Sequence, residues 1–222
     1  MEIRHLLAVL TILLFFINVC RERFSVKSYL LFILFFLPLL DTNITSEKYG
    51  SFTVFDLLTY VSYILLYRVI PIHSKVNRQY KYLFYSLLLI LLIGCVQSEF
   101  ITNSSYNLLK FCSIFIYGKL LIDECIKDPA FIIRVINCLK LSCIISIIFL
   151  FIQLFIGIQF SIYPNPHPNL FDSQINRFPS FFYDPQIYSQ FLAMLSFLFL
   201  IKISEDRKET LINYALFLCV IF

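Results

Sequence analysis

The chain has few charged side chains for its length. Asp, Glu, Lys and Arg make up 14% of its 222 residues, whereas soluble domains contain about a quarter of such residues. Because 59% of the residues are hydrophobic, the charged side chains are too few to cover a water-facing surface, and the excess apolar surface must face lipid. The net charge of +4 is modest and distributed over the loops, which argues against nucleic acid as a partner.

Metal-binding and disulfide patterns are also missing. The seven cysteines form no Cys-x-x-Cys pair, and most of them lie in or beside apolar runs. Cysteine is a small side chain that packs well between helices. We therefore expect packing roles for these residues, and no metal or other cofactor. The cysteines are Cys20, Cys95, Cys112, Cys125, Cys138, Cys143 and Cys219.

The hydrophobic residues occur in blocks separated by polar stretches, as expected for repeated crossings of a hydrocarbon core about 30 Å thick. Only helices and closed barrels satisfy their backbone groups in lipid, and these runs lack the alternation of barrel strands. The sequence therefore predicts an all-α, polytopic transmembrane bundle of about seven or eight spans, forming one domain over residues 1–222. The predicted segments are 4–20, 28–40, 53–70, 82–98, 106–122, 138–158, 186–203 and an eighth that begins at Leu211.

The eighth segment is short. Leu211 and Phe222 enclose twelve residues, which form about 18 Å of helix and do not cross a bilayer core. We therefore expect the last span to be truncated and the chain to be the N-terminal portion of a longer membrane protein.

Basic residues set the predicted orientation. Cytoplasmic loops of membrane proteins are rich in lysine and arginine, and the loops at 21–27 and 71–81 each contain three of these residues. Alternation of the spans then places 41–52, 98–105 and 159–185 outside. The sequence thus predicts an external loop at 159–185.

This external loop contains the residues best suited to chemistry. The prolines at 164, 166, 168 and 179 favour extended or turn backbone. Asp184 and Pro185 form a helix start, because the carboxylate accepts the first free amides and proline fits the first helical position. Arg177 lies among phenylalanines near the predicted interface, where a guanidinium binds a phosphate in a bidentate manner or contacts lipid headgroups. His167 can titrate near neutral pH, although a proline-flanked loop histidine is more often simply solvated.

Other polar groups lie within or beside the predicted spans. Asp56 is near the outer end of the third segment, where an acidic residue lines a cavity or sits at headgroup level. Lys110 and Lys119 lie near the ends of the fifth segment, so their stems can extend to the headgroups. Gln153 is well inside the sixth segment and is expected to hydrogen-bond between helices.

The segment Arg177–Gln186 (RFPSFFYDPQ), followed by an apolar helix, resembles the signature of the O-antigen ligase and O-antigen polymerase superfamily. In that family an arginine, a small residue and an aromatic residue precede an Asp/Asn-Pro helix start. Phe52–Leu58 is similar to the family's entry into an early helix. Ser180 stands where glycine is commoner and Gln186 where asparagine is frequent, which leaves polymerase and ligase both open.

The resemblance implies a metal-independent glycosyltransferase of the bacterial cytoplasmic membrane, used in O-antigen, capsule or exopolysaccharide synthesis. Such a protein transfers a glycan from undecaprenyl diphosphate to an acceptor sugar at the outer face, in the bilayer and alongside other polysaccharide-assembly proteins. Arg177 would stabilise the leaving pyrophosphate, and His167 is a further catalytic candidate. The implied substrate-binding candidates are Asp184, Gln186, Tyr188 and Asp56.

Two other interpretations stay open. A lipid-linked glycan flippase or other multi-pass transporter would also be polytopic, but transporters commonly have charged or Gly/Pro-broken helices near the midplane. This chain has four glycines and no clear midplane charge. A non-catalytic membrane fragment is the third interpretation, because the family's further essential Arg and His residues come from a large external loop in its second half.

Overall fold

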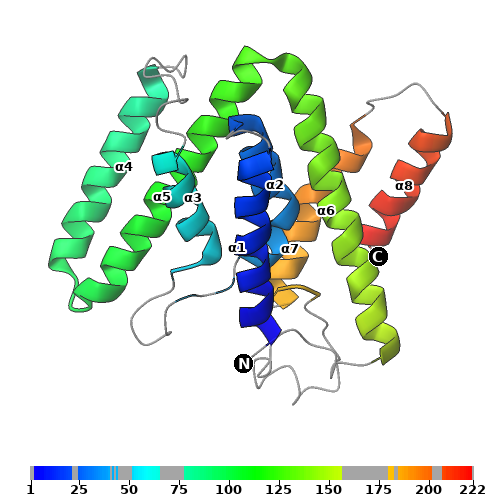
Figure 1. The fold of residues 1–222 in the computed structure, drawn as a ribbon, viewed down its shortest axis with the longest axis horizontal. Helices are drawn as coiled ribbons and strands as arrows, with labels where there is room; N and C mark the ends of the chain where they lie inside the picture. The colour runs from blue at the N-terminus through cyan, green and yellow to red at the C-terminus, as the bar shows by residue number, and fades with distance from the viewer. Residues whose placement is uncertain are drawn as a thin grey trace. The chain divides into compact units, whose positions relative to one another are not determined.

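The computed structural model describes residues 3–21, 25–40, 42, 44, 52–65, 78–156, 180–182, 185–201 and 207–221. Within these residues the regular elements are helices (Figure 1), so the all-α prediction is confirmed. In chain order they are α1 (Ile3–Arg21), α2 (Val26–Leu40), α3 (Val54–Leu65), α4 (Arg78–Gln97), α5 (Ile101–Lys127), α6 (Pro129–Ile156), α7 (Pro185–Ser196), the 3-10 helix η3 (Phe197–Leu200) and α8 (Arg207–Ile221).

Each predicted hydrophobic segment coincides with a helix, but two connections differ from the prediction. The expected loop at 98–105 is mostly helical, because α5 already begins at Ile101. The expected connection between the fifth and sixth segments is reduced to Asp128, since α5 ends at Lys127 and α6 begins at Pro129. Polar and charged residues occupy these helix ends, so hydropathy alone places the helix boundaries too far inward.

The break between α5 and α6 is a capped helix start. Asp128 Oδ1 accepts a hydrogen bond from the amide of Ala130 at 3.1 Å, and Pro129 occupies the first helical position, where its missing amide costs nothing. Asp128 Oδ2 also lies 2.7 Å from Nζ of Lys27. This ion pair ties the first turn of α2 to the end of α5.

Two of the described helices are long and apolar enough to cross a membrane: residues Tyr80–Gln97 of α4, and α6. Four further stretches are apolar but shorter: Leu6–Arg21, Val26–Leu40, Val54–Leu65 and Gln186–Leu200. The structure thus contains two candidate spans among its described residues, and the count of seven or eight stays a prediction.

The chain divides into two compact units. The α3–α5 unit comprises Ala8–Ile33 and Leu40–Ile132, and the α6–α8 unit comprises Met1–Leu7, Leu34–Leu39 and Ile133–Phe222. The organisation as a single domain stays a prediction.

In the α3–α5 unit, α4 and α5 form an antiparallel hairpin (Figure 1). A short turn connects them, in which Ser98 Oγ accepts hydrogen bonds from the amide of Phe100 at 3.1 Å and from Ser104 Oγ at 2.8 Å. Aromatic packing continues along the hairpin, where the Phe84 ring centroid lies 5.1 Å from that of Phe115. Local polar contacts and aromatic packing together fix the two long helices side by side.

Tyr117 of α5 connects α5 to α2 and α3 in the same unit. Its hydroxyl donates to the carbonyl oxygen of Leu30 at 2.9 Å. Its ring packs edge-on against Tyr29 of α2, at 6.1 Å between centroids, and against Phe55 of α3, at 5.5 Å. The side chain is buried, so one residue joins three helices by both polar and apolar contacts.

The α6–α8 unit has its own small apolar core. Cys143 and Ile147 of α6 are buried against Phe199 of η3. The partly buried residues packed around them are Ile144, Leu192, Leu195, Leu216 and Phe217. The core thus combines residues from α6, α7, η3 and α8, and Cys143 has the packing role that the sequence predicts for it.

Candidate functional site

Ser180 holds the end of the predicted external loop in an unusual backbone conformation. Its φ angle is +52°, in the left-handed region that side chains with a Cβ atom seldom adopt. The residue is completely buried in the α6–α8 unit. Glycine enters this region without a steric cost, because it lacks a Cβ atom. The chain has serine there, and the serine hydroxyl donates a hydrogen bond to α6.

Gln153 of α6 binds the backbone of Ser180 with both ends of its amide. The amide of Ser180 donates to Gln153 Oε1 at 2.9 Å, and Gln153 Nε2 donates to the carbonyl oxygen of Ser180 at 3.2 Å. All four groups are buried, so each hydrogen bond satisfies two groups that would otherwise be costly to remove from solvent. The expected hydrogen-bonding role of Gln153 is found, with a loop backbone as its partner.

Ser146, two helical turns earlier on α6, holds the serine side chain. Ser180 Oγ donates to the carbonyl oxygen of Ser146 at 2.7 Å and lies 3.1 Å from Ser146 Oγ. The Tyr188 hydroxyl of α7 donates to the same carbonyl at 3.3 Å. We call Ser146, Gln153, Ser180 and Tyr188 the Ser180 cluster. It is neutral, fully hydrogen-bonded and built from three separate parts of the chain.

Aromatic residues fix the two positions that follow Ser180. Phe181 stacks on Phe149 of α6, with 4.1 Å between ring centroids and 15° between planes. Phe182 is buried and packs against Tyr188 and Phe191 of α7, at 5.7 Å and 5.0 Å. Residues 180–182 are therefore held on one side by α6 and on the other by α7.

The described residues include some of the predicted site residues and not others. Arg177, His167 and Asp184 lie outside the described residues. The helix start predicted at Asp184 and Pro185 agrees with the first residue of α7. Gln186 is exposed in the first turn of α7, where a side chain can reach a ligand.

Tyr188 has a role within the fold. Its side chain is only 4% exposed, and its hydroxyl is bonded to α6 as described above. Packing and hydrogen bonding therefore account for this residue, and a direct contact with substrate would require the α6–α7 packing to open. The sequence places Tyr188 on the site helix, but it cannot show which way the side chain points.

Asp56 is the centre of a second polar cluster, in the α3–α5 unit. Asp56 Oδ2 accepts hydrogen bonds from the amide of Thr53 at 2.9 Å and from Thr53 Oγ1 at 2.7 Å. Asp56 Oδ1 accepts a hydrogen bond from Ser113 Oγ of α5. We call Thr53, Asp56 and Ser113 the Asp56 cluster. Thr53 precedes the first residue of α3, so the pair forms a capping box in which Asp takes the place of the usual Glu.

The carboxylate of Asp56 is fully buried and already accepts three hydrogen bonds. Its position in the first turn of α3 also places it at the positive end of the helix dipole. Helix capping thus explains the residue without a ligand, and the structure favours that interpretation over a cavity-lining one.

Sequence reasoning missed several buried charged residues, among them Asp123, Glu124 and Lys140. The predicted sixth segment begins at residue 138 and places this lysine at the membrane edge, but α6 extends from Pro129 and encloses it. Its side chain is 7% exposed, and its Nζ lies 5.8 Å from the centroid of the Phe199 ring, an attractive cation–π geometry. The eleven residues that precede Lys140 in α6 have mixed polarity, so hydropathy does not reveal that they continue the helix.

Among the described residues, no group of three or more His, Cys, Asp or Glu side chains is placed to hold a metal ion. No protein-family model matches the chain, and neither a curated protein nor a solved structure matches it. The inference about function therefore depends on the residues themselves and on the signature-like segment.

Proposed function

We propose that the chain is a multi-span protein of the bacterial cytoplasmic membrane, with about seven or eight transmembrane helices. The surface of α4 supports this proposal, because its apolar stretch Tyr80–Gln97 has no buried residue. Ile90 is 63% exposed and Val96 is 79% exposed. Contiguous apolar surface of this kind marks contact with a partner or a membrane, and a span-length helix fits a membrane.

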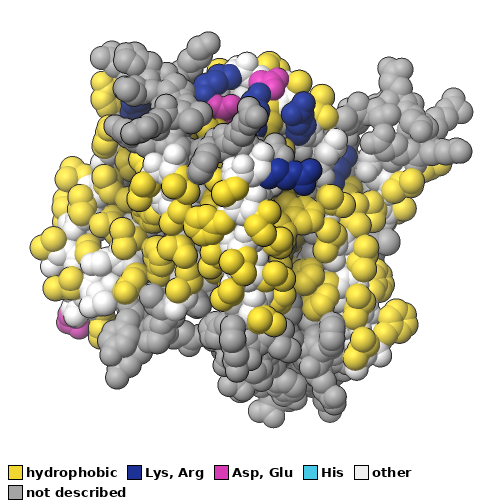
Figure 2. Space-filling view, in the orientation of Figure 1, with side chains coloured by type: hydrophobic (Ala, Val, Ile, Leu, Met, Phe, Trp, Pro, Cys, Tyr) yellow, Lys and Arg dark blue, Asp and Glu magenta, His cyan; other side chains and the backbone are white. Residues whose placement is uncertain are grey.

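The contacts in the α3–α5 unit support the predicted orientation. The ion pair of Lys27 with Asp128 brings the start of α2 to the end of α5. At the opposite end of α5, the ring of Tyr106 lies 6.4 Å from that of Phe52. The connections predicted to lie on one side thus lie together. Figure 2 shows lysine, arginine and acidic side chains gathered at the upper end of α5, with apolar side chains over α4 and α5 below. The basic end corresponds to the cytoplasmic side.

The function that these features support best is glycan transfer. In this proposal the protein is a polysaccharide polymerase or a ligase that acts on a glycan linked to undecaprenyl diphosphate. The Ser180 cluster is the observation that carries the proposal. A neutral, buried cluster that holds a strained backbone position is unusual for a surface loop, since strain persists only where the surroundings enforce it. Such positions concentrate at functional sites.

Arg177 precedes Ser180 by three residues. Both residues belong to the signature-like segment, so the proposal assigns Arg177 to the same site as the Ser180 cluster. In the proposed reaction, the acceptor hydroxyl attacks the anomeric carbon of the donor glycan, and the bond from that carbon to the diphosphate breaks. The hydroxyl proton passes to a base, for which His167 is the candidate. The guanidinium of Arg177 stabilises the negative charge on the leaving diphosphate.

The test is complementation of a deletion strain whose surface polysaccharide depends on the intact gene. Arg177→Ala is expected to abolish polymerisation or ligation, and Arg177→Lys to restore only part of it, because lysine cannot bind diphosphate in a bidentate manner. Arg134→Ala is the matched control, since Arg134 is an exposed arginine of α6. Polysaccharide of normal length and yield from Arg177→Ala would refute the role of Arg177.

The same strains separate glycan transfer from transport. Loss of a polymerase or ligase leaves lipid-linked glycan units at the outer face of the membrane, where an impermeant reagent modifies them in spheroplasts. Loss of a flippase leaves them at the inner face, where they are protected until lysis. Protected units in the Arg177→Ala strain would favour the transporter and contradict the proposed transfer.

A further inference from the structure

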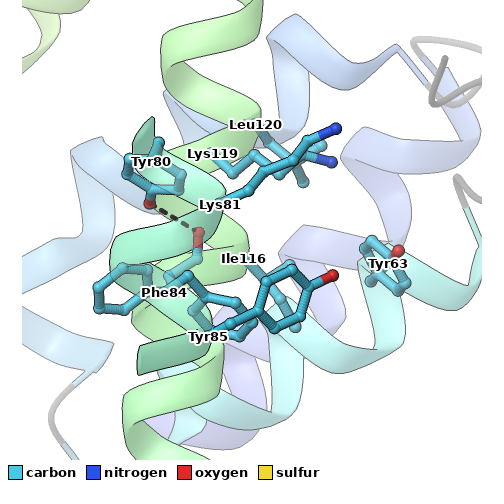
Figure 3. Close-up of a pocket in the computed structure, with 9 residues that line it drawn as sticks. Tyr63, Tyr80, Lys81, Phe84, Tyr85, Ile116, Lys119 and Leu120 are labelled. Atoms are coloured by element: carbon cyan, nitrogen blue, oxygen red, sulfur yellow. Dashed lines mark hydrogen bonds between the residues drawn. The ribbon is translucent and has the colours of Figure 1, made fainter. Parts of the chain in front are cut away.

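The α3–α5 unit contains a pocket of about 310 Å³ between α3, α4 and α5. Figure 3 shows its lining side chains, with Lys81 of α4 and Lys119 of α5 extending in the same direction. The described lining residues are Tyr63, Tyr80, Lys81, Phe84, Tyr85, Phe115, Ile116, Lys119 and Leu120. The pocket therefore combines two cations and three phenols with an apolar floor.

The two ammonium groups have no described counter-ion. Neither Lys81 nor Lys119 makes a hydrogen bond or ion pair with the described residues, whereas the nearby Glu124 is already paired with Lys127. Asp123, one helical turn beyond Lys119 on α5, acts on Tyr80 by its charge, but one carboxylate does not balance two lysines, so the pocket keeps a positive charge that attracts an anion. The pocket also lies in the first turn of α4, which begins at Arg78, and the free amides of a helix start add positive potential.

One tyrosine of the pocket is held in place by the fold. The Tyr80 hydroxyl donates to the carbonyl oxygen of Phe115 at 3.3 Å, as Figure 3 shows with a dashed line. The ring is thus fixed across the α4–α5 hairpin. The hydroxyl of Tyr85 makes no such contact with the described residues, and it can donate to a ligand.

The remaining lining is apolar and continues into the exposed face of α4. Phe84, Phe115 and Leu120 form the floor, and the next turns of α4 expose Leu89 and Ile90 at 59% and 63%. A ligand that fills this surface needs an anionic group and a long hydrocarbon part. A soluble anion would use the lysines but leave the apolar face uncovered.

We propose that this pocket binds the phosphate headgroup of an anionic phospholipid, with Lys81 and Lys119 at the phosphate and the acyl chains along α4. The basic end of α4 and α5 is the predicted cytoplasmic side, where anionic lipid attracts lysine. The site is separate from the Ser180 cluster, and its occupancy does not depend on glycan transfer. The ligand would anchor the α4–α5 hairpin at the membrane surface.

The chain has no tryptophan, which permits a direct test by fluorescence. Tyr85→Trp places a single reporter in the pocket, and Tyr82→Trp places one on the same helix outside the pocket lining. Both positions are similarly exposed, at 62% and 63%. Each variant is reconstituted in phosphatidylcholine vesicles, and quenching is measured with acyl-brominated phosphatidylglycerol or acyl-brominated phosphatidylcholine. Quenching of Tyr82→Trp by both lipids confirms that the protein is inserted.

We expect phosphatidylglycerol to quench Tyr85→Trp more strongly than phosphatidylcholine does, with no such preference at Tyr82→Trp. Each of Lys81→Gln and Lys119→Gln should lower the relative association constant about fivefold. Lys110→Gln, on the same helix as Lys119 but outside the pocket, should leave it unchanged. Equal quenching of Tyr85→Trp by the two lipids would overturn the proposal.

Two further measurements test whether the site takes a lipid rather than soluble phosphate and whether it recognises charge. If added inorganic phosphate removes the preference for phosphatidylglycerol, the site takes soluble phosphate and the lipid assignment is wrong. If either glutamine variant does not fold, the double variant Lys81→Arg with Lys119→Arg decides, because arginine keeps the charge. That pair should retain the preference and lose it as ionic strength rises, and a preference that does not respond to salt would contradict the proposed charge recognition.

Discussion

The Asp56 cluster and the Ser180 cluster are both buried and fully hydrogen-bonded, yet they are built in opposite ways. In the Asp56 cluster a carboxylate three residues from Thr53 caps a helix and also accepts a hydrogen bond from Ser113, 57 positions along the chain. In the Ser180 cluster neutral side chains join residues 27 to 42 positions apart, and they hold a backbone with a positive φ angle. The first cluster uses a charge for local structure. The second uses uncharged groups to fix a loop.

The difference teaches which buried polar group deserves a functional interpretation. The carboxylate of Asp56 looks more reactive, but its oxygens are occupied by a helix cap. Ser180 has modest chemistry, but its surroundings hold an otherwise unfavourable conformation beside the signature-like segment. Backbone strain that the surroundings enforce is therefore a better indicator of a functional site than a buried charge is.

Gln153→Leu is expected to have the largest effect on stability. It removes both hydrogen bonds to the Ser180 backbone and leaves two buried groups unsatisfied, which costs about 2–4 kcal/mol. The free energy of unfolding, measured by denaturant titration in detergent micelles, should fall by that amount. Gln186→Leu is the matched control, since this glutamine is exposed on α7, and it should change little. Equal losses in the two variants would show that the cluster does not hold the segment.

Asp56→Ala is expected to have a smaller effect. It removes the capping box of α3, at a cost of about 1–2 kcal/mol. Ser113 keeps a partner, because its hydroxyl also donates to the carbonyl oxygen of Lys110 at 2.8 Å. Asp56→Asn should lose less, since one side-chain oxygen still accepts. The same titration checks both variants, and a loss as large as that of Gln153→Leu would break the contrast between the clusters.

Ser180→Gly compared with Ser180→Ala should give the smallest difference. Both substitutions remove the hydroxyl and its bond to Ser146, but only glycine enters the left-handed region without strain. Glycine should therefore be more stable than alanine by about 1 kcal/mol. Thermal unfolding of the two variants under identical conditions measures the difference. If alanine proves equal or more stable, the backbone at residue 180 is not strained in the way described.

The sequence predicts the helices well and their connections less well. Long apolar runs predict α4 and α6, and the Asp-Pro dipeptide in the sequence predicts the start of α7 at Pro185. An identical Asp-Pro start at Asp128 went unrecognised, because the charged residues around it resemble a loop. The spacing of Thr53 and Asp56 likewise permits a capping box at the start of α3.

The Ser180 cluster could not be predicted in detail. The sequence indicates that Gln153 needs a polar partner, but the partner is a backbone 27 residues away, and no pattern encodes such a contact. The pocket at Lys81 and Lys119 likewise depends on how α4 and α5 pack, although each lysine is visible in the sequence. Long-range contacts are properties of the fold and not of any segment.

The most direct test of the central claim is the side of the membrane on which the 159–185 segment lies. In a variant whose seven native cysteines are replaced, a single cysteine is introduced by Asn169→Cys, or by Ser74→Cys in the predicted cytoplasmic loop. Intact spheroplasts are then treated with a membrane-impermeant thiol reagent. The account predicts labelling of Asn169→Cys before lysis and of Ser74→Cys only after it. Protection of Asn169→Cys until lysis would contradict an external site for glycan transfer.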